Sequence, residues 1–220
     1  MLTEAQRLPP SVSVPFLDVA THLGLPPIAT YAGLNLWNFA PLCPQKSLSE
    51  MENLSVLHTF TGTEDEAWFY LISVSMEARG ADIIPAMLKA MDAVRGDEPQ
   101  IVADNLLYFA NTLKEIGELL ERMYERCDPE IFYHKIRPFL AGSKNMTHAG
   151  LPKGVFYDEG DGRGEWRCNS GGSNAQSSLI QFFDIVLGVE HSPTGSSRGN
   201  DAKNGFLEVS SVDHFTFERI

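Results

Sequence analysis

The stretch IVADNLLYFANTLKEIGELLERMY, residues 101–124, decides the fold class. Apolar and small side chains recur through it every three or four residues, and charged side chains fill the other face. The repeating positions are Leu106, Phe109, Ala110, Leu113, Ile116, Gly117, Leu120 and Met123. This spacing predicts an amphipathic α-helix with one apolar face. Together with the helical signals around it, the stretch favours an all-α domain.

Further segments on both sides of this stretch carry helical signals. The predicted helices are 14–23, 28–39, 63–79, 83–94, 129–140 and 175–189. Gly24 is placed to end the first of them, and Asp128 followed by Pro129 is placed to begin the fifth. The segment 28–39 is apolar nearly all round, so it predicts a buried helix. One face of 83–94 is expected to carry Ile84, Met87, Leu88 and Met91.

The segment 63–79 is compatible with two conformations on sequence grounds. Its β-branched residues suit a strand. Its length and its first residues favour a helix, because Thr63 and Glu66 have the spacing of a capping box and Asp65 adds negative charge to the first turn. We therefore predict a helix here.

Residues 141–174 differ in character from the segments around them. Glycine is frequent and 158–164 is polar, which predicts a long surface loop with a small hairpin around 155–157 and 166–168. A loop of this length in a compact domain is usually functional or mobile. The sequence lacks a series of strands alternating with helices, so a nucleotide-binding α/β fold is disfavoured.

Composition and charge exclude several classes of protein. The 220 residues carry 29 acidic and 17 basic side chains, for a net charge of −12, which disfavours nucleic acid and anionic membranes as partners. The sequence has no apolar run long enough to cross a bilayer and no signal-peptide pattern. Its three cysteines have neither disulfide nor zinc spacing, so free thiols in a reducing, cytoplasmic compartment are expected.

Common catalytic motifs do not occur in the sequence. It has no phosphate-binding loop, no HExxH and no GxSxG, and its six histidines do not pair at helical spacing. Arg137 lies in the apolar stretch IFYHKIRPFLAG, where an arginine either extends to water or binds a carboxylate. GGSNAQSS (171–178) is either an anion-binding helix start or a loop with a serine cap. The aromatic residues Tyr31, Phe69 and Phe132 are expected to fill the core on this evidence alone.

Four stretches, taken in order and spacing, resemble the indoleamine 2,3-dioxygenase family, and its fungal members in particular. They are LPPIATYAGLNLWNF (25–39), ENLSVLHTFTGTEDEAWFYLISVSMEARGADIIP (52–85), FYHKIRPFLAGSKN (132–145) and GGSNAQSSLIQFFDIVLGVEH (171–191). The resemblance implies part of an all-α haem-dioxygenase domain with haem b as its cofactor. It also implies that both atoms of O₂ are inserted across the 2,3-bond of L-tryptophan or a related indole, giving N-formylkynurenine for the kynurenine pathway.

The resemblance implies roles for seven residues. The expected substrate-binding residues are Tyr31, Phe69, Ser73, Phe132, Arg137, Gly172 and Ser173, of which Ser73, Gly172 and Ser173 are also expected to contact the haem. Within this set, Phe132 matches the aromatic residue that packs on the indole ring. Arg137 matches the arginine that binds the substrate carboxylate. The reaction needs no strong general base, because the cofactor carries the difficult step.

One family motif does not occur here. The proximal histidine of the family lies in a motif resembling YMPGxHRxFL, so no metal ligand is assigned, and His214 lacks that surrounding motif. We expect residues 1–24 to be a remnant of the N-terminal region, 25–191 a partial haem-binding domain, and 192–220 a divergent, disordered tail of a chain truncated at both ends. Two functions stay open for a monomer of this kind: an enzyme impaired by the missing histidine, or a non-catalytic helical fragment that binds haem or another protein.

Overall fold

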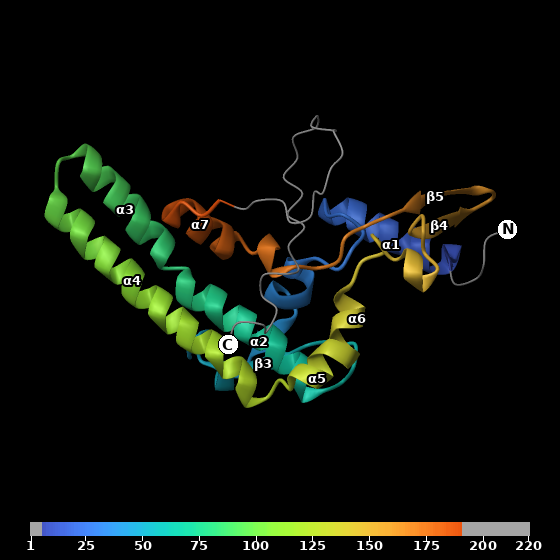
Figure 1. Cartoon of the computed structure of the whole chain (residues 1–220), viewed down its shortest axis with the longest axis horizontal. Coiled ribbons are helices and arrows are strands. Elements are labelled where there is room, and N and C mark those ends of the chain that lie inside the picture. The colour runs from blue at the N-terminus through green and yellow to red at the C-terminus, as the bar shows by residue number, and fades with distance from the viewer. Residues whose placement is uncertain (1–5, 191–220) are drawn as a thin grey trace.

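The computed structural model describes residues 6–190, and the expected tail 192–220, His214 included, lies outside them. The three longest helices are α2 (Glu64–Gly80), α3 (Ile83–Arg95) and α4 (Pro99–Glu121). Helices α2 and α3 follow one another in nearly the same direction, and α4 runs back along both of them (Figure 1). The mostly helical fold therefore agrees with the prediction. No helix within residues 6–190 is both long enough and apolar enough to cross a bilayer.

Two clusters of buried side chains hold the long helices together. The first joins α2 to the segment before it and to the turn after α4, and comprises Met51, Leu54, Trp68, Leu71, Ile72, Val74, Met123 and Cys127. The second joins α3 and α4 to α7 (Ser178–Leu187), and comprises Ile83, Met87, Phe109, Ile116, Leu179 and Phe183. Gly80 lets α7 come close to α2, because a Cβ atom at this position would lie 2.3 Å from Leu179 Cδ2.

Helix α3 is rotated relative to its predicted face. Ile83, Met87 and Ala90 are buried, whereas Leu88 and Met91 are 56% and 53% exposed. The predicted apolar face is therefore correct for Met87 alone. The second buried cluster covers the side of α3 that carries Ile83, and the apolar residues on the other side remain in contact with solvent.

The start of α2 confirms the predicted helix, and the strand alternative for 63–79 is wrong. The Thr63 hydroxyl accepts a hydrogen bond from the Glu66 N–H at 3.3 Å. In a full capping box the Glu66 carboxylate would also accept a hydrogen bond from the Thr63 N–H, and here it does not. It is buried and accepts four hydrogen bonds of 2.6–2.9 Å, from the N–H groups of Phe60 and Thr61 and the hydroxyls of Thr61 and Tyr70. Burial alone would raise the pKa of Glu66, but these hydrogen bonds outweigh it and lower that pKa.

The predicted helix 28–39 is wrong over most of its length. Only Ala32–Leu36 is helical, as a single π-helical turn. The buried Asn38 side chain explains why the helical backbone ends after Leu36, because its amide donates to the carbonyls of Leu34 and His58 and accepts from the His58 N–H. These side-chain hydrogen bonds compete with the backbone bonds of a regular helix.

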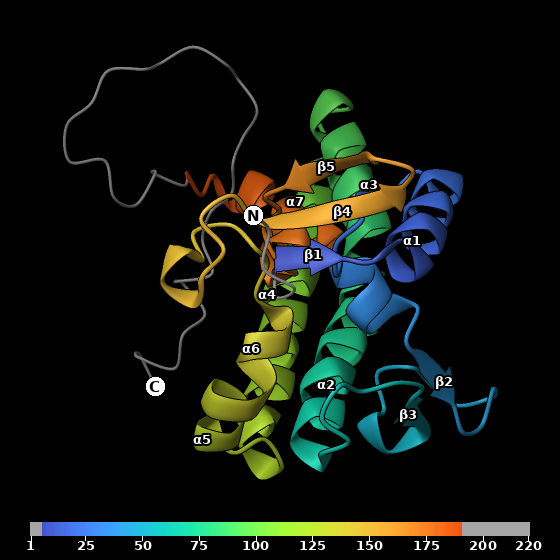
Figure 2. The same ribbon diagram turned by 90° about the vertical axis from the view of Figure 1, so that its right-hand side faces the viewer.

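Two small sheets flank the helices. In one, β2 (Phe39–Pro41) pairs antiparallel with β3 (Leu54–Val56). In the other, β4 (Val155–Gly160) and β5 (Arg163–Arg167) form the predicted hairpin, and β1 (Arg7–Leu8) pairs parallel with β4. Helix α1 (Pro10–Leu23) lies beside this sheet (Figure 2) and ends at Gly24, which has a φ of 65° as predicted for a left-handed cap.

The predicted helix 129–140 is continuous but irregular. It consists of α5 (Pro129–Ile131), the π-helical turn Phe132–Ile136 and α6 (Arg137–Leu140). Asp128 caps its start as predicted, since its carboxylate accepts hydrogen bonds from the N–H groups of Glu130 and Ile131. Short 3₁₀ turns complete the described secondary structure at Met51–Asn53, Arg122–Glu125, Thr147–Ala149 and Asn174–Gln176.

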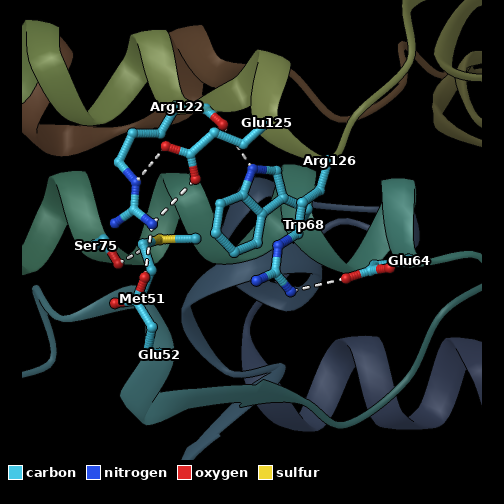
Figure 3. A network of polar contacts seen from close by, with 8 residues as sticks. All are labelled: Met51, Glu52, Glu64, Trp68, Ser75, Arg122, Glu125 and Arg126. Atoms are coloured by element: carbon cyan, nitrogen blue, oxygen red, sulfur yellow. Dashed lines mark hydrogen bonds and ion pairs between the residues drawn. The ribbon is translucent and has the colours of Figure 1, made fainter.

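A polar network fixes the end of α4 against α2 (Figure 3). Trp68 lies between the guanidinium groups of Arg122 and Arg126, which are 5.4 and 4.7 Å from its ring centroid. The indole N–H of Trp68 donates to the Arg122 carbonyl at 2.8 Å. The carboxylates of Glu52, Glu64 and Glu125 pair with the two arginines at 2.6–3.0 Å. These contacts hold α2 in place beside the segment that leads into α5.

Candidate functional site

A small hollow of about 40 Å³ lies between α2, the end of α4 and the segment that leads into α7. Its apolar lining comes from Ile72, Met76, Leu120, Met123, Leu179 and Ile180. Its polar lining comes from Tyr31, Ser73, Glu77, Asn174 and Ser177. The hollow therefore has an apolar wall with a few hydroxyl, carboxylate and amide groups on one side.

Tyr31 and the segment before α7 meet at the carboxylate of Glu77. The Tyr31 hydroxyl donates to Glu77 Oε1 at 3.0 Å, and the Ser177 hydroxyl donates to the same oxygen. The Tyr31 N–H donates to Gln176 Oε1 at 2.8 Å. Burial raises the pKa of the Tyr31 phenol and the Glu77 charge raises it further, so the phenol stays protonated and acts as a donor.

Ser73, Phe69 and Phe132 form a second part of the site. Ser73 is buried in the lining of the hollow, and its hydroxyl donates to the Phe69 carbonyl at 3.4 Å. One turn earlier on α2, the Phe69 ring lies 4.7 Å from the Phe132 ring, measured between centroids. Both phenylalanines are half-buried and pack against the first core cluster. Two aromatic rings in tilted contact thus lie one turn of α2 away from Ser73 in the lining of the hollow.

Arg137 follows Phe132 by five residues and has no carboxylate partner within residues 6–190. Its guanidinium lies 5.3 Å from the centroid of the Tyr133 ring, and the residue is half-buried. Six other arginines do pair with carboxylates: Arg7, Arg79, Arg95, Arg122, Arg126 and Arg167. The Tyr133 ring orients the guanidinium, and this contact is compatible with both alternatives from the sequence, an arginine that extends to water or one that binds a carboxylate.

The loop before α7 is held in place by close packing of its backbone. A Cβ atom on Gly172 would lie 2.8 Å from Leu34 Cδ1 and 3.0 Å from the Ala29 carbonyl oxygen. Ser173 caps the turn Asn174–Gln176 by accepting from the Ala175 N–H, and Ser177 caps α7 by accepting from the Ile180 N–H. The serine cap, one of the two alternatives from the sequence for this segment, is therefore present.

The structure brings five of the seven predicted residues to or beside the hollow. Tyr31 and Ser73 line it, Phe69 lies one turn before Ser73 on α2 and contacts Phe132, and Ser173 immediately precedes Asn174 in its wall. Gly172 packs against Ala29 and Leu34, close to the Tyr31 turn, and Arg137 lies on α6 outside the lining.

Sequence reasoning missed Glu77, Gln176 and Ser177. The spacing of Glu77 was an available signal, because it follows Ser73 by four residues and so lies on the same face of α2. The partners of Glu77 are 46 and 100 residues away in the sequence, which no local pattern predicts. Asn174 received no role from the sequence, and it lines the hollow.

The lining of the hollow has the chemical character of a surface that contacts a haem face, but it does not supply an axial ligand. The mostly apolar wall, with the Ser73 hydroxyl in it, suits contact with a flat apolar ring system. Across residues 6–190, no three His, Cys, Asp or Glu side chains cluster as a metal site would require. None of the described histidines contributes to the lining of the hollow.

Comparison with known proteins identifies the family. The indoleamine 2,3-dioxygenase family model matches residues 2–212. Indoleamine 2,3-dioxygenase of Saccharomyces cerevisiae is 45% identical over 214 residues, which cover 94% of this chain and 46% of the yeast protein. Indoleamine 2,3-dioxygenase acdA of Aspergillus candidus is 43% identical over 202 residues, which cover 90% and 50%. The 6-hydroxytryptophan 2,3-dioxygenase fscD of Fusarium equiseti is 40% identical over 188 residues, which cover 85% and 46%.

The match extends along nearly the whole of this chain, although the chain spans about half the length of the curated relatives that it matches. The family is one of helical haem dioxygenases, in agreement with the helices seen here. This chain therefore belongs to the indoleamine 2,3-dioxygenase family.

Proposed function

We propose that this chain provides the substrate-facing wall of a haem-dependent dioxygenase site that cleaves the 2,3-bond of L-tryptophan or a related indole. The observation that carries the proposal is the ring contact between Phe69 and Phe132, together with Arg137 five residues after Phe132, an arginine without a carboxylate partner among the described residues. An aromatic surface next to a cation suits an amino acid with an aromatic side chain. The names of the relatives, two indoleamine 2,3-dioxygenases and a 6-hydroxytryptophan 2,3-dioxygenase, point to the same class of substrate.

In this proposal, Phe132 packs on the indole ring and Arg137 binds the substrate carboxylate. A guanidinium forms two parallel hydrogen bonds with a carboxylate, so it fixes the orientation of the ligand as well as its position. Holding the indole in one orientation lowers the entropic cost of bringing it to the reacting oxygen. Tyr31 and Ser73, from two different segments, line the apolar space and help to keep water out of it.

The haem would lie against the wall formed by Ser73 and the segment with Gly172 and Ser173. When bound, it supplies the ferrous iron that binds O₂ for the oxidation. Both oxygen atoms end in the product N-formylkynurenine, so L-tryptophan and one O₂ balance without a further reductant. The residues of the site act by binding, orientation and exclusion of water. We keep a cytoplasmic monomer as part of this proposal.

A titration with L-tryptophan tests the proposal. The purified chain is loaded with haem and reduced, and its Soret absorption is followed as L-tryptophan is added. Saturable haem uptake and a saturable shift on addition of L-tryptophan are expected. Haem uptake without a response to L-tryptophan would contradict the substrate assignment and would favour the alternative of a non-catalytic haem-binding fragment. Absence of haem uptake would contradict the cofactor assignment.

A further inference from the structure

The backbone between Phe132 and Arg137 is wound as a π-helical turn. The Arg137 N–H donates to the Phe132 carbonyl, five residues earlier, instead of to the Tyr133 carbonyl four residues earlier. Single π-helical turns inside α-helices are rare and occur frequently at functional sites. This turn connects the aromatic residue and the arginine on which the proposed substrate binding depends.

The π-helical turn determines which face of the helix Arg137 occupies. In an α-helix each residue advances about 100° around the axis, so positions five apart differ by roughly 140° and lie on different faces. In a π-helical turn the hydrogen bond joins residues five apart, so these two residues lie much closer to a common face than they would in an α-helix. Phe132 and Arg137 can therefore face the same ligand here, whereas in a regular α-helix they could not.

The residue after Arg137 is Pro138, which disfavours a regular α-helical turn before it. Proline has no N–H, so Pro138 cannot donate to the His134 carbonyl four residues earlier, and its ring would clash with that carbonyl in a regular α-helix. Widening the preceding turn relieves this clash. Ile136, which is 0% exposed, anchors the widened turn in the core, while Phe132 packs against Phe69 on α2.

We propose that Pro138 is a positioning residue for substrate selection. By keeping the turn π-helical, it places the Arg137 guanidinium on the face that also carries the Phe132 ring. The selected ligand is an indole that bears a carboxylate, and indoles without a carboxylate gain nothing from this arrangement. The inference rests on the proposed function for its ligand, but its statement about the backbone does not.

The test compares Pro138→Ala with the wild-type chain in two measurements. The first is the NMR coupling through the hydrogen bond of the residue 137 amide, which reports the accepting carbonyl without any ligand. The second is calorimetric binding of L-tryptophan and of tryptamine, which lacks the carboxylate, to the haem-loaded chain. Pro85→Ala is the matched control, because Pro85 is an exposed proline in the first turn of α3, away from the site. A circular dichroism melt verifies that each variant folds.

The wild-type chain and Pro85→Ala are expected to show coupling between residues 137 and 132 and to prefer L-tryptophan. In Pro138→Ala the coupling is expected to move to residue 133, and the preference for L-tryptophan over tryptamine to fall roughly 10- to 100-fold, as for loss of a charge-assisted hydrogen bond. Persistence of the coupling to residue 132 would overturn the role of Pro138. If the coupling moves to residue 133 but the preference for L-tryptophan over tryptamine is unchanged, the proposed link between the turn and substrate selection is overturned. If the wild-type chain binds neither compound, the proposed function fails and the ligand part of this inference fails with it, while the coupling still decides the backbone part.

Discussion

Replacing Glu77 with methionine should loosen the contact between the Tyr31 turn, α2 and the segment before α7. Glu77 accepts hydrogen bonds from two hydroxyls that are almost fully buried, since Tyr31 and Ser177 are 5% and 1% exposed. Methionine has a similar length and shape but offers neither hydroxyl a strong acceptor. The two hydroxyls would therefore lose their charged partner.

The magnitude follows from the two hydrogen bonds that are lost. A hydrogen bond to a charged group contributes about 1.5–3 kcal/mol, which gives roughly 3–6 kcal/mol for the pair. Glu77 is only half-buried, so solvent screens part of its charge, and we expect a loss of about 2–4 kcal/mol in the free energy of unfolding. Glu77→Gln keeps an oxygen acceptor at the same place, so its loss should be smaller, at about 1 kcal/mol.

Urea unfolding followed by circular dichroism measures the total loss, and hydrogen exchange locates it. The Tyr31 N–H, which donates to Gln176, and the N–H groups of residues 175–180 should exchange faster in Glu77→Met than in Glu77→Gln. A double-mutant cycle with Tyr31→Phe isolates the contribution of the Tyr31 hydroxyl. The reasoning would be refuted if Glu77→Met lost less than about 0.5 kcal/mol, the effect typical of an unimportant surface position.

Three further predictions follow from other parts of the chain. Arg137→Ala should lower kcat/KM for L-tryptophan in steady-state kinetics by about 2–4 kcal/mol in equivalent free energy. It should leave the calorimetric binding of tryptamine unchanged, and equal losses for both ligands would argue against the carboxylate contact. Because the folded-state pKa of Glu66 lies below its usual value of 4.5, its stabilisation is present above that pH and is lost as the pH falls through the folded value. Acid titration of the unfolding free energy should thus show a steeper loss in the wild-type chain than in Glu66→Gln, and parallel curves would contradict the assignment. Gly172→Ala should cost about 1–3 kcal/mol in urea unfolding because its Cβ would press on Leu34 and the Ala29 carbonyl, whereas Gly117→Ala, with open space around it, should be neutral or stabilising; equal effects would contradict the packing argument.

Local signals allowed much of the helical structure to be predicted from the sequence. The caps at Gly24, Thr63 and Asp128 depend on a few neighbouring residues, and all three are observed. The hairpin β4–β5 followed from short-range composition in the same way. The long helix α4 followed from its periodicity, which extends over many turns.

Features that depend on distant residues could not be predicted in this way. Asn38 ends the helical backbone after Leu36 because it bonds to His58, twenty residues later. The orientation of α3 depends on how α4 and α7 pack against it, and its apolar residues occur on more than one face.

The candidate site was predicted through resemblance to the family, because its residues come from four separate stretches with no shared local motif. The parts that resemblance left out are those defined by contact, such as Glu77 between Tyr31 and Ser177. The π-helical turn Phe132–Ile136 was not predicted either. Pro138, to which we attribute this turn, is nevertheless visible in the sequence.

Oxygen-isotope labelling tests the central claim most directly. The haem-loaded, reduced chain is supplied with L-tryptophan under ¹⁸O₂, and the product is analysed by mass spectrometry, with Arg137→Ala as the comparison. The account predicts N-formylkynurenine that carries two labelled oxygen atoms from the wild-type chain, and a strongly reduced yield from Arg137→Ala. The account would be contradicted if the haem-loaded wild-type chain formed no doubly labelled product, or if Arg137→Ala gave an equal yield.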